Sequence, residues 1–185
     1  MFRQYVQLHS ETVDSALLLL SGVILMGLLS PHSYELADGV QFVPQVSLML
    51  LWPVLWGWKI GTLTILMYLV VGGVGIPVFL GQSSGWTSFA GPSGGYLFAF
   101  PLVGLIAGWM AEGVQRLRYA TASLILLLCR FLIELLGLFW FTNMTHQNFE
   151  MSTAISDASA PILVQSAMDS LVVVLIGRIL TGHRR

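Results

Sequence analysis

Residues 43–76 read VPQVSLMLLWPVLWGWKIGTLTILMYLVVGGVGI, and this stretch determines what kind of protein the chain is. Lys59 is its only charged residue, and the stretch is much longer than the about 20 apolar residues with which a helix crosses a membrane. The sequence Gly57-Trp58-Lys59 interrupts it near the middle, where glycine favours a turn. We therefore predict two short membrane-spanning helices, residues 43–57 and 60–76, joined by a tight turn.

The composition of the whole chain also indicates a membrane protein. Of its 185 residues, 56% are hydrophobic and 9% are charged, and the mean hydropathy is +0.81; soluble domains carry about 25% charged residues. A soluble domain of this size has too little interior to bury so many apolar side chains. The net charge is -1, and the Lys and Arg residues are too scattered to follow a phosphate backbone. We therefore expect a lipid bilayer around the chain and exclude nucleic acid as a partner.

The other apolar runs predict four further spans, so that residues 1–185 form a single six-span domain of an all-α integral membrane protein. A cleaved signal peptide is the rival interpretation of the first run. We keep that run as mature structure, because residues 1–14 carry two acids and Ser30-Pro31-His32 is not a small-x-small cleavage pattern. The four further spans cover about residues 15–31, 95–111, 119–141 and 161–180.

The distribution of positive charge orients the six spans. Loops 31–42, 76–94 and 142–160 contain no Lys or Arg, and Lys and Arg concentrate on the cytoplasmic side of membrane proteins. Both termini are therefore expected in the cytoplasm. Loop 76–94 is rich in Gly, Ser and Pro, so we predict a structured outer loop between the third and fourth spans. The cationic residues expected at the cytoplasmic side are Arg3, Lys59, Arg116, Arg118, Arg178, Arg184 and Arg185.

Three charged residues lie deep within the predicted spans, namely Arg130, Glu134 and Asp169. Each costs about 2.5 to 3.5 kcal/mol to insert at mid-bilayer. Arg130 and Glu134 are four residues apart, so an intrahelical ion pair is the simplest explanation of Arg130. Glu134 and Asp169 lie at a similar depth, roughly 11 to 12 Å from the outer ends of their spans. Either they line a polar pocket that opens outward, or Asp169 makes a hydrogen bond that packs two helices together.

Catalytic chemistry finds little support in the sequence. The four histidines lie outside the spans, and neither HExxH nor GxxxxGK[ST] occurs. We therefore expect no enzyme activity, no cofactor and no metal, and any energy for transport has to come from a partner. The sequence GPSGGY, residues 91–96, starts the fourth span with its amino end outside. It is either an anion site at the helix dipole or an ordinary helix start.

Two motifs give the chain its resemblance to a known family. GPSGGY, where the family usually has Gly-Pro-Thr-Gly-Gly-Tyr, follows Gly75-Ile76-Pro77-Val78-Phe79 at the right distance. Together with Gln45, Tyr68 and Glu112 they resemble BioY, the biotin-binding S components of energy-coupling-factor (ECF) importers. The resemblance is close over residues 43–112 and weaker around Asp169.

The resemblance implies a six-helix capture subunit of a cell membrane, most typically the bacterial plasma membrane. Such a subunit takes biotin from the outer side and docks on a transmembrane coupling subunit driven by two ATPases. Biotin's ureido ring offers two N–H donors and a carbonyl, which suits acceptors such as Asp169 and Gln45, and its thiophane ring and tail suit aromatic walls. The candidate ligand-binding residues are Gln45, Tyr68, Phe79, Gly91, Ser93, Gly94, Gly95, Tyr96, Glu134 and Asp169.

The chain departs from the family in three places. Val172 stands where BioY proteins commonly have a lysine, three positions beyond the aspartate. The first helix lacks the Ala-xxx-Ala face expected for docking and has Ser15, Gly22 and Gly27 at other spacings. An Arg130–Glu134 pair is not a family feature. Two alternatives therefore stay open: an S component for another small vitamin-like ligand, and a membrane scaffold without transport function.

Overall fold

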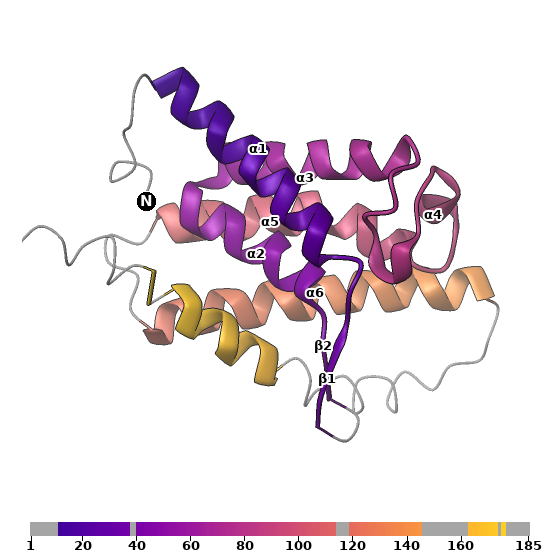
Figure 1. The fold of residues 1–185 in the computed structure, drawn as a ribbon. Helices are drawn as coiled ribbons and strands as arrows, with labels where there is room; N and C mark the ends of the chain where they lie inside the picture. Colours follow the sequence, from indigo (N-terminus) through magenta and orange to yellow (C-terminus); the bar gives the residue numbers. More distant parts are fainter. Residues whose placement is uncertain (1–10, 38–39, 114–118, 146–162, 174, 177–185) are drawn as a thin grey trace, which may run out of the picture.

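The computed structural model describes residues 11–37, 40–113, 119–145, 163–173 and 175–176. Figure 1 shows them as a bundle of helices with a small hairpin and a folded loop at one end. The long helices are α1 (Glu11–Leu29), α2 (Pro44–Trp56), α3 (Trp58–Gly73), α5 (Gly94–Glu112), α6 (Tyr119–Thr145) and a last helix, Leu163–Val173. The short elements are β1 (Tyr34–Ala37), β2 (Val40–Phe42), η2 (Leu80–Gln82) and α4 (Thr87–Ala90).

Each predicted span overlaps a helix, and residues 161–162, 174 and 177–180 of the last span lie outside the described residues. By length and composition, two helices within the described residues can cross a membrane, Gly94–Glu112 and Ala120–Met144. The other four are apolar but shorter than this criterion requires. The predicted helical fold is therefore confirmed, while the number of spans and their orientation remain predictions.

The turn between α2 and α3 forms where the sequence predicts it. Gly57 has a φ of +94°, which is unfavourable for any residue with a side chain. The backbone N–H of Trp58 donates a hydrogen bond to Oε1 of Glu112 at 3.2 Å, and a Cβ at position 57 would lie 2.5 Å from the same oxygen. The α2–α3 turn therefore lies beside the carboxyl end of α5, at one end of the bundle.

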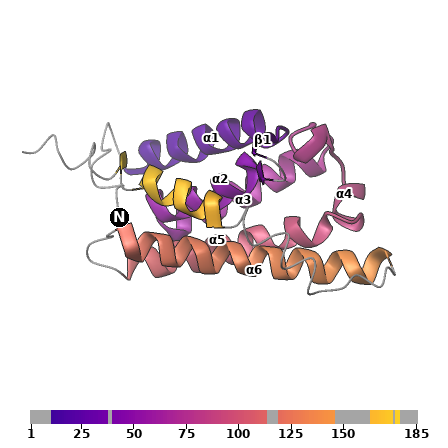
Figure 2. The ribbon, with the colours of Figure 1, turned by 90° about the horizontal axis from the view of Figure 1, so that it is seen from below.

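Helix α5 forms the centre of the bundle, where it packs against α2, α3 and α6. Small residues allow this close approach: a Cβ at Gly108 would lie 2.7 Å from the backbone of Trp58. Figure 2 shows α5 beside α6, with the last helix, in yellow, near α2 at the end of the bundle away from α4. The core is therefore shared by helices that are distant in sequence.

Helix α1 packs into the bundle and departs in one respect from the sequence prediction. A Cβ at Gly22 would lie 2.6 Å from Trp52 and Thr64, and one at Gly27 would lie 3.3 Å from Val78. These small residues therefore serve packing inside the bundle and do not form an outward docking face. The helix also begins earlier than the predicted span, so that Asp14, which the sequence places before the membrane, lies within α1 and is buried.

The hairpin of β1 and β2 is the second departure, because an all-α chain was expected. The two strands pair antiparallel, with Tyr34 opposite Phe42 and Ala37 opposite Val40. Apolar and polar residues alternate in VQF and in the first three residues of YELA, which is the period of a strand. Asp38-Gly39 stands between them in the sequence, and this dipeptide is a strong hairpin signal. The sequence of this short loop therefore does contain a hairpin signal.

Candidate ligand pocket

The loop that follows α3 folds back on the ends of α1 and α3. The backbone N–H of Gly85 donates to the carbonyl of Gly72 at 2.8 Å, and that of Gly81 donates to the carbonyl of Pro31 at 3.1 Å. Within the loop, the N–H of Phe79 donates to the carbonyl of Ser83 at 3.1 Å. The prediction of a structured loop over residues 76–94 is therefore confirmed.

Aromatic rings connect this loop with three helices. Phe79 lies edge-on to Tyr68 of α3 and to Phe89 of α4, each with ring centroids 5.7 Å apart. Phe89 in turn contacts Phe98 of α5 at 5.7 Å, and Phe98 contacts Trp140 of α6 at 5.6 Å. Aromatic pairs of this kind contribute about 0.5 to 1.5 kcal/mol each beyond their buried area. The series therefore holds the loop at a defined distance from α5 and α6.

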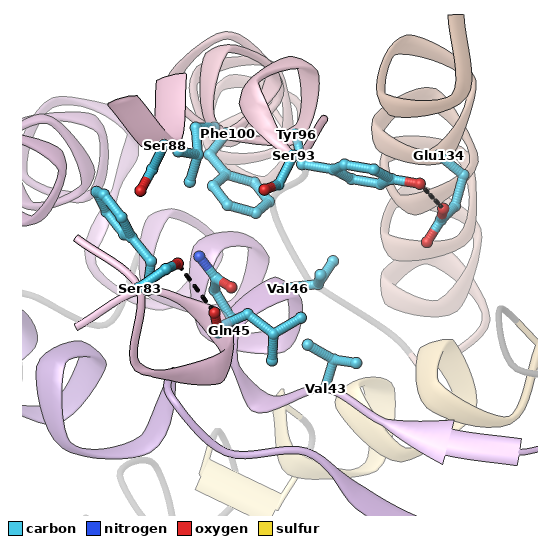
Figure 3. A pocket seen from close by; sticks show the side chains of 12 residues that line it. Val43, Gln45, Val46, Ser83, Ser88, Ser93, Tyr96, Phe100 and Glu134 are labelled. Carbon is cyan, nitrogen blue, oxygen red and sulfur yellow. Dashed lines mark hydrogen bonds between the residues drawn. The ribbon is translucent and has the colours of Figure 1, made fainter. Parts of the chain in front are cut away.

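A pocket of about 320 Å³ lies between this loop, the start of α2, α5 and α6 (Figure 3). Its volume falls within the range of about 300 to 1,000 Å³ that is typical of small-molecule sites. Most of its surface is apolar, with a few polar side chains that converge on it. The lining residues are Val43, Gln45, Val46, Phe79, Leu80, Ser83, Ser88, Ser93, Tyr96, Leu97, Phe100 and Glu134.

Gln45 presents a hydrogen-bond acceptor to the pocket. Its Nε2 donates to the hydroxyl of Tyr68 at 3.2 Å, and that hydroxyl donates to the carbonyl of Val78 at 2.8 Å. Both side chains are buried. Because the amide nitrogen is directed to Tyr68, the amide oxygen of Gln45 stays available for a ligand N–H. Tyr68 therefore lies behind the pocket wall and orients Gln45, whereas the sequence placed it in the ligand site itself.

Glu134 and Tyr96 form the wall on the α6 side. The hydroxyl of Tyr96 donates to Oε2 of Glu134 at 3.1 Å, as Figure 3 shows. The ring of Tyr96 lies directly against Gly137 of α6, where a Cβ would overlap the ring. The absence of a side chain at position 137 thus allows Tyr96 to reach Glu134. One carboxylate oxygen, Oε1, remains for a ligand.

The glycines of GPSGGY act mainly through packing. A Cβ at Gly95 would overlap the ring of Trp140, and one at Gly94 would overlap the backbone of Phe89. Nε1 of Trp140 donates to the carbonyl of Gly91 at 3.0 Å, which attaches the loop to α6. Of the predicted residues in this motif, Ser93 and Tyr96 line the pocket.

The first turn of α5 is an ordinary helix start. The N–H of Gly94 donates to the carbonyl of Gly91 at 3.0 Å, and the N–H groups of Tyr96 and Leu97 donate to the carbonyl of Ser93 at 3.1 and 3.3 Å. These donors are therefore engaged by the backbone. The geometry favours a helix start over an anion site.

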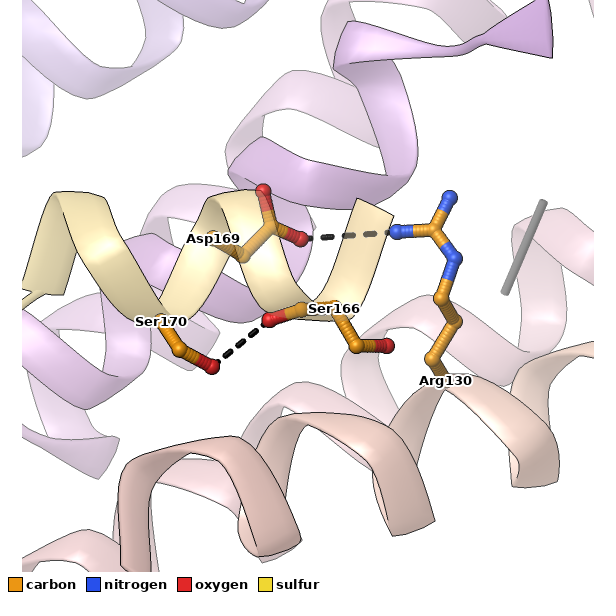
Figure 4. Close-up of polar contacts among 4 residues, drawn as sticks. All are labelled: Arg130, Ser166, Asp169 and Ser170. Atoms are coloured by element: carbon orange, nitrogen blue, oxygen red, sulfur yellow. Dashed lines mark hydrogen bonds and ion pairs between the residues drawn. The ribbon is translucent and has the colours of Figure 1, made fainter. Parts of the chain in front are cut away.

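The buried arginine pairs across helices and not along its own. Nη1 of Arg130 lies 3.4 Å from Oδ2 of Asp169 on the last helix, and each side chain is 3% exposed (Figure 4). The sequence predicted an intrahelical ion pair of Arg130 with Glu134; in the structure the ion-pair partner of Arg130 is Asp169, and Glu134 accepts a hydrogen bond from Tyr96. Asp169 is not among the residues that line the pocket. Its observed role matches the helix-packing alternative that the sequence left open.

Sequence reasoning found part of the pocket. It named Gln45, Phe79, Ser93, Tyr96 and Glu134, all of which line it. A helix periodicity signal existed for one missed residue, since Phe100 follows Tyr96 by four positions and shares its face of α5. No comparable signal marks the serines of the loop. The missed lining residues are Val43, Val46, Leu80, Ser83, Ser88, Leu97 and Phe100.

Comparisons with known proteins agree on one family. Residues 4–184 match the BioY family. The chain is 34% identical over 139 residues to the probable biotin transporter BioY of Pyrococcus horikoshii, which covers 75% of this chain and 79% of that protein. It is 31% identical over 115 residues to the biotin transporter BioY2 of Lactococcus lactis, covering 61% of this chain and 60% of that one.

The fold also matches a solved structure. The crystal structure of the S-component for biotin from an ECF-type ABC transporter superimposes with a TM-score of 0.78. It covers 94% of this chain and 95% of that one at 18% identity, which shows a shared fold. The helical architecture predicted from the sequence is therefore confirmed at the level of the fold. Because the family match spans nearly the whole chain, the protein belongs to the BioY family.

Proposed function

We propose that this chain is the biotin-binding S component of an ECF-type importer. The observation that carries the proposal is the pocket itself: in a chain of the BioY family, a cavity of about 320 Å³ combines apolar walls with hydrogen-bond acceptors. The named relatives are biotin transporters, and the fold is that of a biotin S-component. These similarities support the same ligand here.

The chemistry of the pocket suits a cyclic urea. The amide oxygen of Gln45 and Oε1 of Glu134 accept hydrogen bonds, and a ureido ring offers two N–H donors. The rings of Phe79, Tyr96 and Phe100 provide the apolar walls that a thiophane ring requires. Gln45, Phe79, Ser93, Tyr96 and Glu134 thus bind the ligand. Tyr68, Gly91, Gly94, Gly95 and Asp169 support the site from behind.

The position of the pocket supports capture from the outer side. It lies at the end of the bundle where α5 begins, whereas the α2–α3 turn with Lys59 lies at the end where α5 finishes. The positive charges of the sequence place that second end in the cytoplasm. In this arrangement six helices cross the cell membrane, both termini are cytoplasmic, and the pocket opens outward.

Transport requires energy from other subunits. The sequence contains no phosphate-binding GxxxxGK[ST] motif. We therefore infer a transmembrane coupling subunit and ATPase subunits as partners. Affinity purification of the tagged chain in mild detergent from its own host should recover both kinds of subunit. Recovery of the chain alone, with biotin binding intact, would argue against this partnership.

Calorimetric titration of the detergent-purified chain tests the ligand directly. We expect biotin to bind at micromolar concentration or below, and unrelated vitamins not to bind. Glu134→Gln should weaken binding about 5- to 10-fold, because a hydrogen bond to a charged acceptor is about 1 kcal/mol stronger than one to a neutral acceptor. Glu35→Gln, at an exposed carboxylate of β1, is the matched control and should bind as the wild type does. No response to biotin would contradict the proposal.

A second ligand stays a candidate because of Val172. The lysine that BioY proteins commonly carry at this position is absent, so an S component for another vitamin-like molecule is the alternative. A response to a different vitamin in the same titration, with none to biotin, would favour it. A scaffold function, which the buried Arg130–Asp169 pair alone would support, predicts no response to any small ligand.

A further inference from the structure

We propose that the pocket recognises the hydrogen-bond donors of its ligand and offers no cationic partner to an acidic tail. The donor end of the ligand lies against Glu134, and the tail lies at the opposite, serine-lined end. The site therefore prefers ligands whose tail is a neutral amide over the free carboxylic acid. This inference rests on the proposed function and specifies the chemical class of ligand for the same site.

The charges of the lining residues provide the first step. Glu134 is the one charged side chain among the described residues that line the pocket. Its carboxylate accepts a hydrogen bond from the hydroxyl of Tyr96 at 3.1 Å, and the nearby charge of Arg130 on the same helix is shared with Asp169. A ligand carboxylate in the same pocket therefore meets a charge of its own sign.

The cations of the chain are engaged or distant. Within the described residues, Lys59 lies at the far end of the bundle, beside the ring of Trp58. Arg130 is paired with Asp169, and both side chains are 3% exposed. Drawing Arg130 toward a ligand would leave the carboxylate of Asp169 buried and unpaired, which is strongly unfavourable.

The sequence excludes a cation from the neighbouring segments. Residues 38–39 and 146–160 lie outside the described residues; by sequence they belong to two of the loops predicted on the outer side, and they contain no Lys or Arg. The remaining cations stand at positions that the sequence predicts to be cytoplasmic. Among the described residues that line the pocket, none offers a positive charge to an acidic tail.

The hydroxyl groups of the pocket support the same orientation. Oγ of Ser83 donates to the carbonyl of Leu80 at 3.0 Å, and Oγ of Ser88 donates to the carbonyl of Ser84 at 3.0 Å. Their protons are engaged, so each offers only lone pairs to a ligand. Lone pairs suit the NH₂ group of an amide and repel a carboxylate. Figure 3 shows both serines on the side of the pocket away from Glu134.

The donor end of the ligand finds its complement beside Glu134. Oε1 of Glu134 and the amide oxygen of Gln45 accept N–H groups. Ser93 lies next to Tyr96 in the same view, and its hydroxyl can donate to a urea carbonyl (Figure 3). A cyclic urea therefore fits at this end both as a hydrogen-bond donor, through its N–H groups, and as an acceptor, through its carbonyl.

Titration with biotin and with biotin primary amide tests the inference. At a separation of about 10 Å and effective dielectric constants of about 20 to 40, repulsion between two negative charges changes affinity by about 4- to 15-fold. We expect the wild-type chain to bind the amide at least about threefold more tightly than biotin. Glu134→Gln should bring the two affinities to within about twofold of each other, and Glu35→Gln should keep the wild-type ratio.

The outcomes separate this inference from the proposed function. An amide that binds wild type no more tightly than biotin overturns the inference, while the binding of biotin itself upholds the function. A preference for the amide that persists in Glu134→Gln also overturns it, because the preference then does not come from this carboxylate. Failure of both ligands to bind overturns the proposed function, and the inference with it.

Discussion

At the scale of single residues, the pocket depends on polar side chains that hold one another in place. The hydroxyl of Tyr68 accepts from Gln45 and donates to Val78, and this fully buried tyrosine never touches the pocket. Its function is to set the orientation of the Gln45 amide. In an apolar surrounding, an unsatisfied carbonyl or amide is costly, so such a chain of hydrogen bonds has one favourable arrangement.

Tyr68→Phe should therefore affect both stability and binding. It removes the donor to the carbonyl of Val78, which stays buried, so we expect a loss of about 1 to 3 kcal/mol in the free energy of unfolding. Biotin should also bind more weakly, because the amide of Gln45 loses its partner. Thermal denaturation in detergent and calorimetry measure the two effects. Tyr34→Phe, at an exposed tyrosine of the hairpin, is the control, and equal behaviour of the two variants would contradict this role.

The residue scale also shows where sequence reasoning reached its limit. The spacing of Arg130 and Glu134 shows that the two side chains can meet on one helix face. It does not show which residues the neighbouring helices bring to that face. Asp169 and Tyr96 are the partners in the structure, and both come from other helices. The partners of Arg130 and Glu134 are therefore determined by long-range packing, which helix periodicity does not reveal.

At the scale of elements, two polar side chains of α6 attach it to segments other than α5. The ion pair of Arg130 and Asp169 connects it to the last helix, and the hydrogen bond of Trp140 to Gly91 connects it to the loop before α5. Glu134 lies between these contacts in sequence. The position of the pocket wall on α6 therefore depends on both.

Arg130 and Asp169 should be coupled in their contributions to stability, and neither should contribute directly to ligand binding. Arg130→Met leaves the carboxylate of Asp169 buried and unpaired, so we expect a loss of about 3 to 5 kcal/mol in the free energy of unfolding. Replacing both residues, in Arg130→Met/Asp169→Leu, should recover most of that loss, since no buried charge remains. A double-mutant cycle in detergent measures the coupling. If the losses of the two single variants simply add in the double variant, Arg130 and Asp169 do not stabilise each other.

Biotin binding by the same double variant locates the ligand. Because neither side chain lines the pocket, the affinity should stay within about threefold of the wild type. A much larger loss, in a variant as stable as the wild type, would mean that Asp169 or Arg130 contacts the ligand.

Removing the hydrogen bond of Trp140 to Gly91 should change the position of the loop more than the stability of the fold. Trp140→Phe keeps an aromatic ring beside Gly95 and removes the donor to Gly91. We expect biotin affinity to fall about 2- to 10-fold, which corresponds to the about 0.5 to 1.5 kcal/mol of one hydrogen bond. Trp109→Phe, at an exposed position of α5, is the matched control. If both variants bind as the wild type does, the loop does not depend on this bond.

At the scale of the whole molecule, the charge pattern of the sequence predicts one orientation in the membrane. Ser33 is exposed near the hairpin, and Gly113 is exposed just beyond the end of α5. Cys129 is the chain's single cysteine and is buried. The chain is therefore well suited to cysteine labelling.

Labelling in intact cells tests this orientation. In a Cys129→Ala chain, Ser33→Cys should react with a membrane-impermeant thiol reagent added outside. Gly113→Cys should react only after the membrane is permeabilised. The opposite pattern would reverse the topology and place the pocket on the cytoplasmic side.

The architecture could largely be predicted from the sequence, because runs of apolar residues and the interruption at Gly57 are local signals. The hairpin was missed because its strands are very short. The pocket was predicted in part. Residues near the GPSGGY motif and the acid at position 134 could be named, whereas Ser83 and Ser88 join them only through the fold of the loop. The partners of the buried charges required three-dimensional packing.

An experimental structure of the purified chain with biotin bound would show whether the ligand lies between the loop, α2, α5 and α6. We predict the bicyclic ring beside Glu134 and Gln45, the tail toward Ser83 and Ser88, and the Arg130–Asp169 pair intact. Biotin seated against Asp169 with that pair broken, or bound outside this pocket, would contradict the account.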